Sequence, residues 1–349
     1  MESNKHIIGY DRIRIIAMLM VVGIHTNVAY LAANVGTAGW YLVMEITALY
    51  LVAVPLYFMI SGATLLTKES SESPYLQVKK RLKKQGIPFL VWSLIYIFFR
   101  IIMGKVEFSA GTFLALLNTP AYYQFWFMYT LLAIYLLLPI LQPLVQKLSR
   151  VHIEYLLLLW IFFSVVQPTL ERVCPVLKIS EHIDLVLCEG YIGYFFLGHY
   201  LRSYWYKIPV RKAIGISLLG LFITGTAAFL EYVCYSEVYA GFFYQSYLTP
   251  GVVIATSGLF LAFQNAQWRR GTRLCSKLAD LSIGVYYVHM LCATALSYAG
   301  LAGENSVVLL TVKLGIVYLC SLAAAFLIAK IPIARGILLG MPERNENEN

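Results

Sequence analysis

Residues 11–25 read DRIRIIAMLMVVGIH, so a charged cluster stands at the edge of a long apolar run that contains a histidine. An ionisable side chain inside a membrane span costs about 2.5–3.5 kcal/mol on insertion scales and is rarely kept there without a role. Arg14 and His25 are eleven residues apart, which at about 100° and 1.5 Å per residue is almost the same helix face, about 16 Å further along. Alone, Arg14 also fits a snorkelling arginine and His25 a buried structural histidine. Their shared phase favours one functional path.

The composition is that of a membrane protein. Of the 349 residues, 60% are hydrophobic and 13% charged, and the mean hydropathy is +0.71. Soluble domains contain about 45–50% apolar and about 25% charged residues, so most of this chain must be in contact with a lipid bilayer. The first apolar run is too long for a signal peptide and has no small-residue cleavage site after it.

The apolar runs predict an all-α, polytopic transmembrane helical bundle. A span needs about 20 apolar residues. About ten spans are expected, of which 188–202 is short and 40–66 is long, with a kink expected at Pro55. The ten are placed at 10–31, 40–66, 86–103, 125–146, 152–170, 188–202, 208–231, 245–265, 279–300 and 307–330.

The basic residues predict the orientation. In a ten-span arrangement with the N-terminus inside, 22 of the 27 Lys and Arg residues fall on the cytoplasmic side. Both termini are therefore expected in the cytoplasm, and the chain in the cell membrane. The net charge of +9 follows from this loop signal. The basic loops lack interleaved aromatic residues, so nucleic acid is not expected as a partner.

One membrane domain over residues 1–341 is expected, followed by a polar cytoplasmic tail at 342–349. No internal repeat is visible, which disfavours many transporter folds. Cys174 and Cys188 fall in one outer loop, and their pairing stays open. The remaining histidines are scattered without ligand spacing, so no metal site is expected; these are His6, His152, His182 and His199.

Several motifs, in order along the chain, resemble the acyltransferase 3 family of integral-membrane O-acyltransferases. The opening run to His25 resembles its first helix, which carries a basic residue and a histidine at this spacing. Further matches are VPLYFMISG at 54–62, KRLKKQGIP at 80–88, FWFM at 125–128 with Tyr135 and Pro139, the Gly/aromatic stretch 190–198, and SIGVYYVH at 282–289. The resemblance implies an acyltransferase 3-like domain over 1–341.

The resemblance implies an acyl-CoA donor that is supplied from the cytoplasm, and no bound cofactor. Its phosphates would be bound by Arg14 and by the basic loop at 79–84. Within this loop, Arg81 and Lys84 match family positions. The family often has arginine where Lys84 stands, and lysine cannot make a bidentate contact. The loop also fits a plain orientation signal.

The resemblance also implies a general base. His25 would remove the proton from an acceptor hydroxyl as it attacks the thioester. Glu45, at a similar expected depth in the second span, would accept the other ring N–H and set the tautomer, as the carboxylate of a triad does. The alternative for Glu45 is a carboxylate that faces water among the headgroups.

Further along the chain, Ser282, Tyr286 and His289 are spaced i, i+4, i+7 and share one helix face. They are candidates for substrate binding, or for hydrogen bonding between helices. Trp126 is a candidate for stacking on a sugar ring, or for a residue of the interfacial aromatic belt.

We therefore predict a membrane O-acyltransferase that moves an acyl group, acetyl by family resemblance, from cytoplasmic acyl-CoA to an outward-facing hydroxyl, such as that of an envelope glycan. The alternative is a transporter of a small polar solute such as an amino acid; a sensor or assembly partner without turnover ranks third. The acyl group, the acceptor, a homo-oligomeric state and a covalent intermediate stay open.

Overall fold

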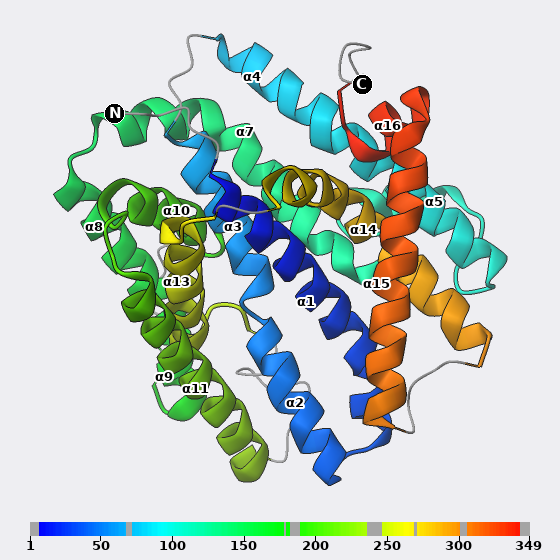
Figure 1. Cartoon of the computed structure of the whole chain (residues 1–349), viewed down its shortest axis with the longest axis horizontal. Coiled ribbons are helices and arrows are strands. Elements are labelled where there is room, and N and C mark those ends of the chain that lie inside the picture. Colours follow the sequence, from blue (N-terminus) through cyan, green and yellow to red (C-terminus); the bar gives the residue numbers. More distant parts are fainter. Residues whose placement is uncertain are drawn as a thin grey trace.

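The computed structural model describes residues 7–67, 72–177, 179–181, 189–235, 246–268, 271–300 and 306–342. Every regular element in this part of the chain is helical (Figure 1). The elements in chain order are α1 (Ile8–Ala33), α2 (Ala38–Tyr50), α3 (Ala53–Leu65), α4 (Pro74–Arg81), η1 (Leu82–Gly86), α5 (Ile87–Ile102), α6 (Ala110–Leu114), η2 (Ala115–Leu117), η3 (Tyr123–Phe125), α7 (Trp126–Lys147), α8 (Arg150–Trp160), η4 (Ile161–Val166), α9 (Gln167–Val173), η5 (Ile179–Glu181), α10 (Ile192–Tyr204), α11 (Val210–Tyr235), α13 (Pro250–Asn265), α14 (Thr272–Tyr298), α15 (Val307–Lys330) and α16 (Pro332–Leu339).

These elements confirm the polytopic helical bundle. Eight helical stretches within the described residues are long and apolar enough to cross a membrane. Four of them join elements end to end: α2 with α3, α4 with α5, η3 with α7, and α8 with α9. The two predicted spans outside these eight correspond to α10 and α13, which have only 13 and 16 residues. Both pack inside the bundle, α10 against α3 and α13 against α11.

The second span breaks where proline chemistry requires it. α2 ends at Tyr50, and α3 begins at Ala53, so the kink precedes Pro55 rather than coinciding with it. Proline has no N–H to donate, and its ring clashes with the carbonyl of the residue four positions earlier, which here is Leu51. Pro55 therefore lies in the first turn of α3, where its missing N–H does not interrupt the helix.

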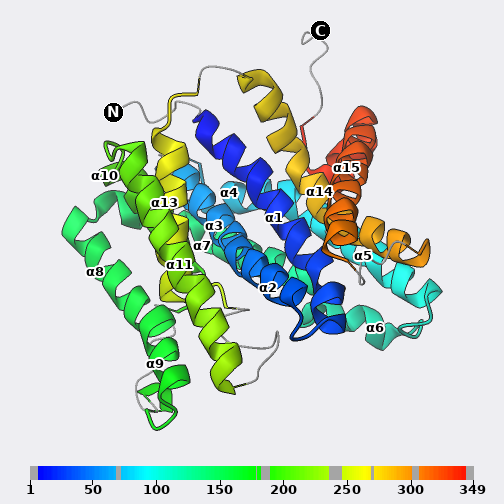
Figure 2. The same cartoon turned by 60° about the horizontal axis from the view of Figure 1, so that its bottom comes forward.

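α1 lies between the two sides of the molecule (Figures 1 and 2), with α8, α9 and α11 on one side and α5 and α15 on the other. It packs against α2, α3, α13, α14 and α15. α1 begins and α15 ends at the same end of the bundle (Figure 1). Polar contacts near this end join α1 to α14, through Ser276 and Asp11 (2.7 Å), and α10 to α3, through Arg202 and the Ala63 carbonyl (2.8 Å). We call this end of the bundle, where α1 begins and α15 ends, the basic end.

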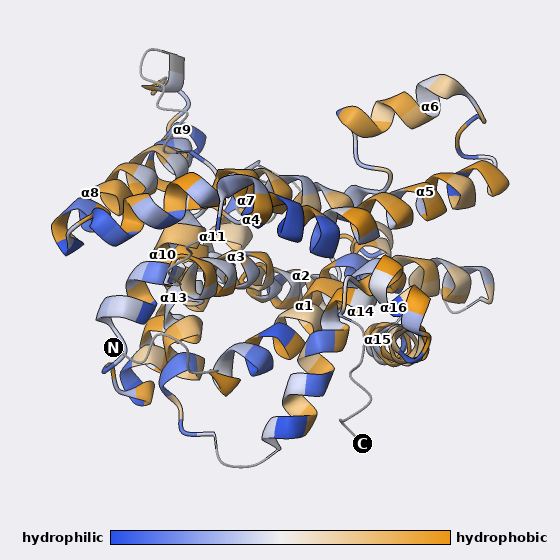
Figure 3. Ribbon diagram, turned by 90° about the horizontal axis from the view of Figure 1, so that it is seen from above, coloured by the Kyte–Doolittle hydropathy of each residue, from blue (hydrophilic) through white to orange (hydrophobic). Residues whose placement is uncertain are grey.

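The periphery is apolar. α5 is hydrophobic over most of its length (Figure 3), and Leu90 and Phe98 expose about half of their surface. On α15, Leu319 and Leu327 are each 64% exposed. Large exposed apolar surfaces are unfavourable in water and favourable against lipid. We therefore assign α5 and α15 to the outer ring of helices that faces the lipid, the lipid-facing ring.

α3 and α10 approach closely because each places a glycine at the contact. Gly62 lies against the backbone of Phe195, and Gly198 lies against the backbone of Met59. Small residues at such crossings let the two backbones pack directly in a membrane. The close approach of α3 to α10 therefore explains why position 62 is a glycine. This crossing also positions α3, which lines the cavity described below.

Replacing Gly62 with alanine is therefore expected to destabilise the protein. The new Cβ would overlap the Phe195 carbonyl, and overpacking of this kind typically costs about 1–3 kcal/mol. Thermal unfolding of purified protein should show a lower midpoint. Gly215→Ala is the matched control, because a Cβ there meets open space; equal midpoints for the two variants would contradict the close-packing argument.

Candidate active site

One cavity of about 480 Å³ runs along α1, and it collects most of the predicted residues. α1 contributes Ile24 and four residues that follow the i, i+4, i+7, i+11 pattern of a single helix face, Arg14, Met18, Val21 and His25. Arg14 and His25 thus line the same cavity, as their spacing predicts. The other walls come from α3, η1, α7, α14 and α16, together with residues before α7 and α13 and after α16. No lining residue belongs to α5, α8, α9, α11 or α15.

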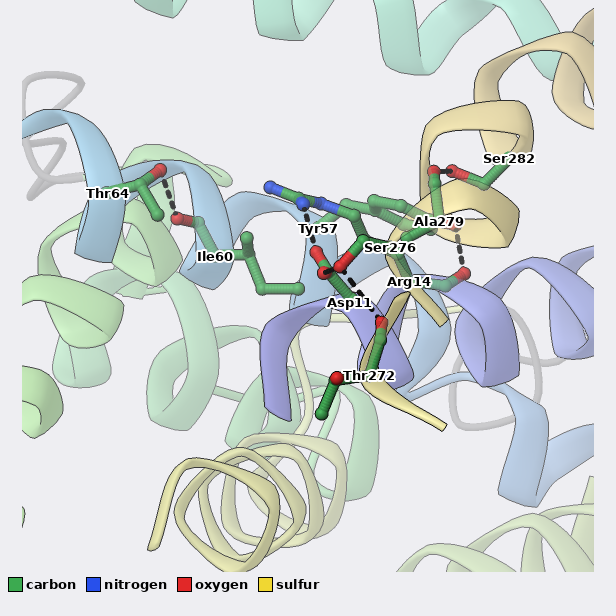
Figure 4. Close-up of polar contacts among 9 residues, drawn as sticks. All are labelled: Asp11, Arg14, Tyr57, Ile60, Thr64, Thr272, Ser276, Ala279 and Ser282. Atoms are coloured by element: carbon green, nitrogen blue, oxygen red, sulfur yellow. Dashed lines mark hydrogen bonds and ion pairs between the residues drawn. The ribbon is translucent and has the colours of Figure 1, made fainter. Parts of the chain in front are cut away.

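Arg14 is held at the basic end of the cavity by its neighbours (Figure 4). Its Nη1 lies 3.0 Å from Oδ1 of Asp11, and Oδ2 of Asp11 accepts a hydrogen bond from Ser276 (2.7 Å). Its backbone carbonyl accepts a hydrogen bond from the Tyr57 hydroxyl (2.8 Å). The guanidinium has other N–H groups besides the one on Asp11, so Arg14 can also bind an anion in the cavity.

Two further cations line this end. Lys84 lies in η1, a π-helical turn between α4 and α5, and Arg335 lies in α16. Asp280 of α14 also lines the cavity and interacts electrostatically with Arg14, Lys84 and Arg335. Wide π-helical turns occur frequently at functional sites. The three cations come from distant parts of the chain, and together they outnumber the two carboxylates beside them, Asp280 and Asp11.

Arg81 does not line the cavity, but it lies close behind its wall. Its guanidinium carbon lies 5.8 Å from the ring centre of Tyr135, and Tyr135 lines the cavity. A role for Arg81 in donor binding stays a prediction. The geometry supports Lys84 more directly.

A pair of imidazoles stands at the other end. The rings of His25 and His289 are stacked at 26° with their centres 5.3 Å apart, and Tyr123 meets His25 edge-on at 5.0 Å. His289 is fully buried, and its Nδ1 lies 2.8 Å from the Tyr286 carbonyl and 3.1 Å from that of Val285. A carbonyl can only accept, so Nδ1 carries the hydrogen, and Nε2 carries a lone pair.

Only two of the three residues on the predicted polar face of α14 line the cavity. Ser282 and Tyr286 line the cavity, whereas His289 contacts it through His25. The Tyr286 hydroxyl donates to the Gln124 carbonyl (2.9 Å), and the Ser282 hydroxyl donates to the Ala279 carbonyl (2.7 Å). Both helix-joining and substrate-contacting roles are therefore compatible with this face.

Trp126 lines the cavity within an aromatic group. Its ring centre lies 5.1 Å from that of Tyr191 and 5.7 Å from that of Tyr247, and Tyr247 is also a lining residue. This inward packing favours a site residue over a belt residue at the membrane surface.

Glu45 lies elsewhere. Its carboxylate lies against Gly225 of α11, and it is not a lining residue. α2 faces α1 through Thr47, which accepts a hydrogen bond from Asn27 (2.7 Å). Two residues correspond to about 200° of helix rotation, so Glu45 points away from α1. The structure does not bring Glu45 to His25, and the predicted carboxylate–imidazole contact lacks support.

Sequence reasoning missed Gln124, which lines the cavity and is only 2% exposed. It is near the Tyr96 hydroxyl, but neither polar atom of its side chain makes a hydrogen bond of standard geometry with the described residues. A buried amide with unused hydrogen-bonding capacity is costly unless a ligand or water satisfies it. Its position next to the FWFM motif was the one available signal.

Two predictions fall at the limits of the described residues. Cys174 is described as a free, exposed thiol, but Cys188 lies outside the described residues, so their pairing stays a prediction. The predicted polar tail at 342–349 is described only at Pro342, and Pro342 lines the cavity.

A family model described as "Acyltransferase domain" matches residues 7–330. No curated protein and no solved structure matches the chain.

Proposed function

Because this chain belongs to the acyltransferase 3 family, we propose that it moves an acyl group from cytoplasmic acyl-CoA to a hydroxyl at the outer side of the cell membrane. Membership makes the chain an integral-membrane acyltransferase. The observation that carries the finer proposal is the cavity along α1, which has cations at one end and a histidine pair near the other. We assign the basic end to the cytoplasm, where loop Lys and Arg residues gather.

The cations suit the donor. Acyl-CoA carries several phosphate charges, and arginine binds phosphate through a planar fork while lysine acts as a point charge. Arg14 and Lys84 would bind these phosphates, with Arg81 close behind the wall. The distance of about 16 Å from Arg14 to His25 along α1 gives the pantetheine arm a course towards the imidazoles.

The histidine pair suits proton transfer. In the proposed step, the acceptor oxygen attacks the thioester carbonyl, and His25 takes the hydroxyl proton. The new C–O bond forms as the C–S bond breaks, and the CoA thiolate then takes this proton from His25. His289 packs on His25 in the fixed tautomer described above. Glu45 is not needed for this step.

The end of the cavity near His25 suits an acceptor with a hydroxylated ring. Trp126 and Tyr247 offer aromatic surface, and Gln124 offers a buried amide. A glycan of the cell envelope carries both ring faces and hydroxyls, and acetyl is the proposed acyl group. This assignment of acceptor and acyl group rests on chemistry alone.

The test is turnover by the purified full-length protein in lipid nanodiscs. With acetyl-CoA and an envelope glycan fraction, we expect release of free CoA thiol and acetyl ester on the glycan. In sealed liposomes, labelled amino acids should not accumulate. Uptake of solute with no thioester consumption in either preparation would replace the acyltransferase by the transporter.

A further inference from the structure

The C-terminal helix covers the basic end of the cavity. α16 begins at Pro332, after the last residue that the family model matches. Arg335, Leu339 and residues 340–342 nonetheless line the cavity, at the end that holds Arg14 and Lys84. The basic end is therefore incomplete without this segment.

The cover is held in one position by contacts with α5, η1 and α14. The Trp92 indole donates to the Leu338 carbonyl (2.9 Å), and Leu339, 3% exposed, packs near Gly284. Gly340 has a φ of +61° and lies directly against the Lys84 carbonyl, where a Cβ would not fit. The helix thus ends beside the π-helical turn that carries Lys84.

The chain turns back at Gly340. The Gly340 N–H donates to the Gly336 carbonyl (3.1 Å), and the Met341 N–H donates to the Arg335 carbonyl (3.3 Å). The first of these bonds is that of the αL C-cap motif, which ends a helix with a glycine in the left-handed conformation. The reversal brings Met341 and Pro342 to the cavity wall.

Arg335 has unused binding capacity. Its Nε is buried and has no hydrogen-bond partner among the described residues. Its electrostatic contact is with Asp280, a carboxylate that Arg14 and Lys84 share. Three cations share two carboxylates, Asp280 and the Asp11 that binds Arg14, which leaves net positive charge for an incoming anion. A buried guanidinium N–H is costly unless an acceptor meets it.

From these observations we infer that α16 supplies the third phosphate-binding cation of the donor site, Arg335, which binds the nucleotide phosphates of acyl-CoA together with Arg14 and Lys84. The inference rests on the proposed acyl-CoA donor. It extends the donor site beyond the matched domain, to a residue that the basic-residue count treats only as an orientation signal.

The experiment measures CoA binding to the full-length protein in zwitterionic nanodiscs. Arg335→Gln should weaken CoA binding about 10-fold, the effect of losing one charged hydrogen bond, and Arg335→Lys should lie in between. Acetyl-pantetheine, which has no nucleotide phosphates, should bind both proteins equally. Lys330→Gln is the matched control, because Lys330 is exposed at the end of α15 and lies outside the cavity.

Each other result has a defined meaning. Unchanged CoA affinity in folded Arg335→Gln protein, when the parent binds CoA, would overturn the role of Arg335 and leave the proposed function standing. A parent protein that binds no CoA would overturn the donor assignment and this inference with it. A loss that appears only in nanodiscs with anionic lipid would assign Arg335 to a lipid headgroup and overturn the inference.

Discussion

Replacing His25 with glutamine is expected to lower acyl transfer by about 10²–10⁴-fold, the usual contribution of a general base. Glutamine keeps a polar side chain but cannot take a proton at neutral pH. CoA affinity should be unchanged, because Arg14, to which we assign phosphate binding, lies about 16 Å away along α1. Acyl transfer and CoA binding should be measured on the same purified samples.

The controls separate chemistry from packing. His25→Phe keeps a ring against His289 and Tyr123 but has no nitrogen, so it should be as inactive as the glutamine variant. His289→Phe tests the second imidazole in the same way. An active His25→Gln enzyme would remove the base assignment, and an inactive His289→Phe beside it would move the assignment to His289.

Removing the charges of Arg14 and Lys84 together is expected to weaken acyl-CoA binding by about 100-fold or more. Each charged hydrogen bond contributes about 1.5–3 kcal/mol, and both side chains line the basic end of the cavity. The binding that remains should depend less on ionic strength, because fewer ionic contacts are left to screen. Titration of CoA at two salt concentrations measures both effects.

Two comparisons make this result specific. Arg14→Lys keeps the charge and loses the planar fork, so it should lie between the parent and Arg14→Gln. Lys147→Gln makes the same charge change at the exposed end of α7, outside the cavity. A double variant with parental CoA affinity would show that the phosphates bind elsewhere.

Much of the bundle was predictable because its signals are local. Apolar runs of span length gave the helices, and the family match confirms the resemblance that the motifs carried. The phase between Arg14 and His25 was also local, since one unbroken helix carries both residues. Pro55 marked the region of the break, although steric contact with the preceding turn places the break a few residues earlier.

The remaining features depend on contacts between helices. The depth of Glu45 could be read from the chain, but its rotation about α2 depends on which neighbour α2 packs against. The stacking of His25 on His289 joins residues 264 positions apart. Arg335 could not be told from an orientation signal, because a cation that follows a membrane span serves either purpose until its surroundings are known.

The separation between the cavity and the lipid-facing ring has a mechanical consequence. A helix whose length does not match the bilayer tilts or bends, or deforms the lipid around it. α5 and α15, which expose long apolar faces, contribute no side chain to the cavity, whereas α3, which does, is largely buried. Strain from a thicker or thinner bilayer would therefore fall mainly on the outer helices, and the spacing of groups along α1 should stay constant from one membrane composition to another.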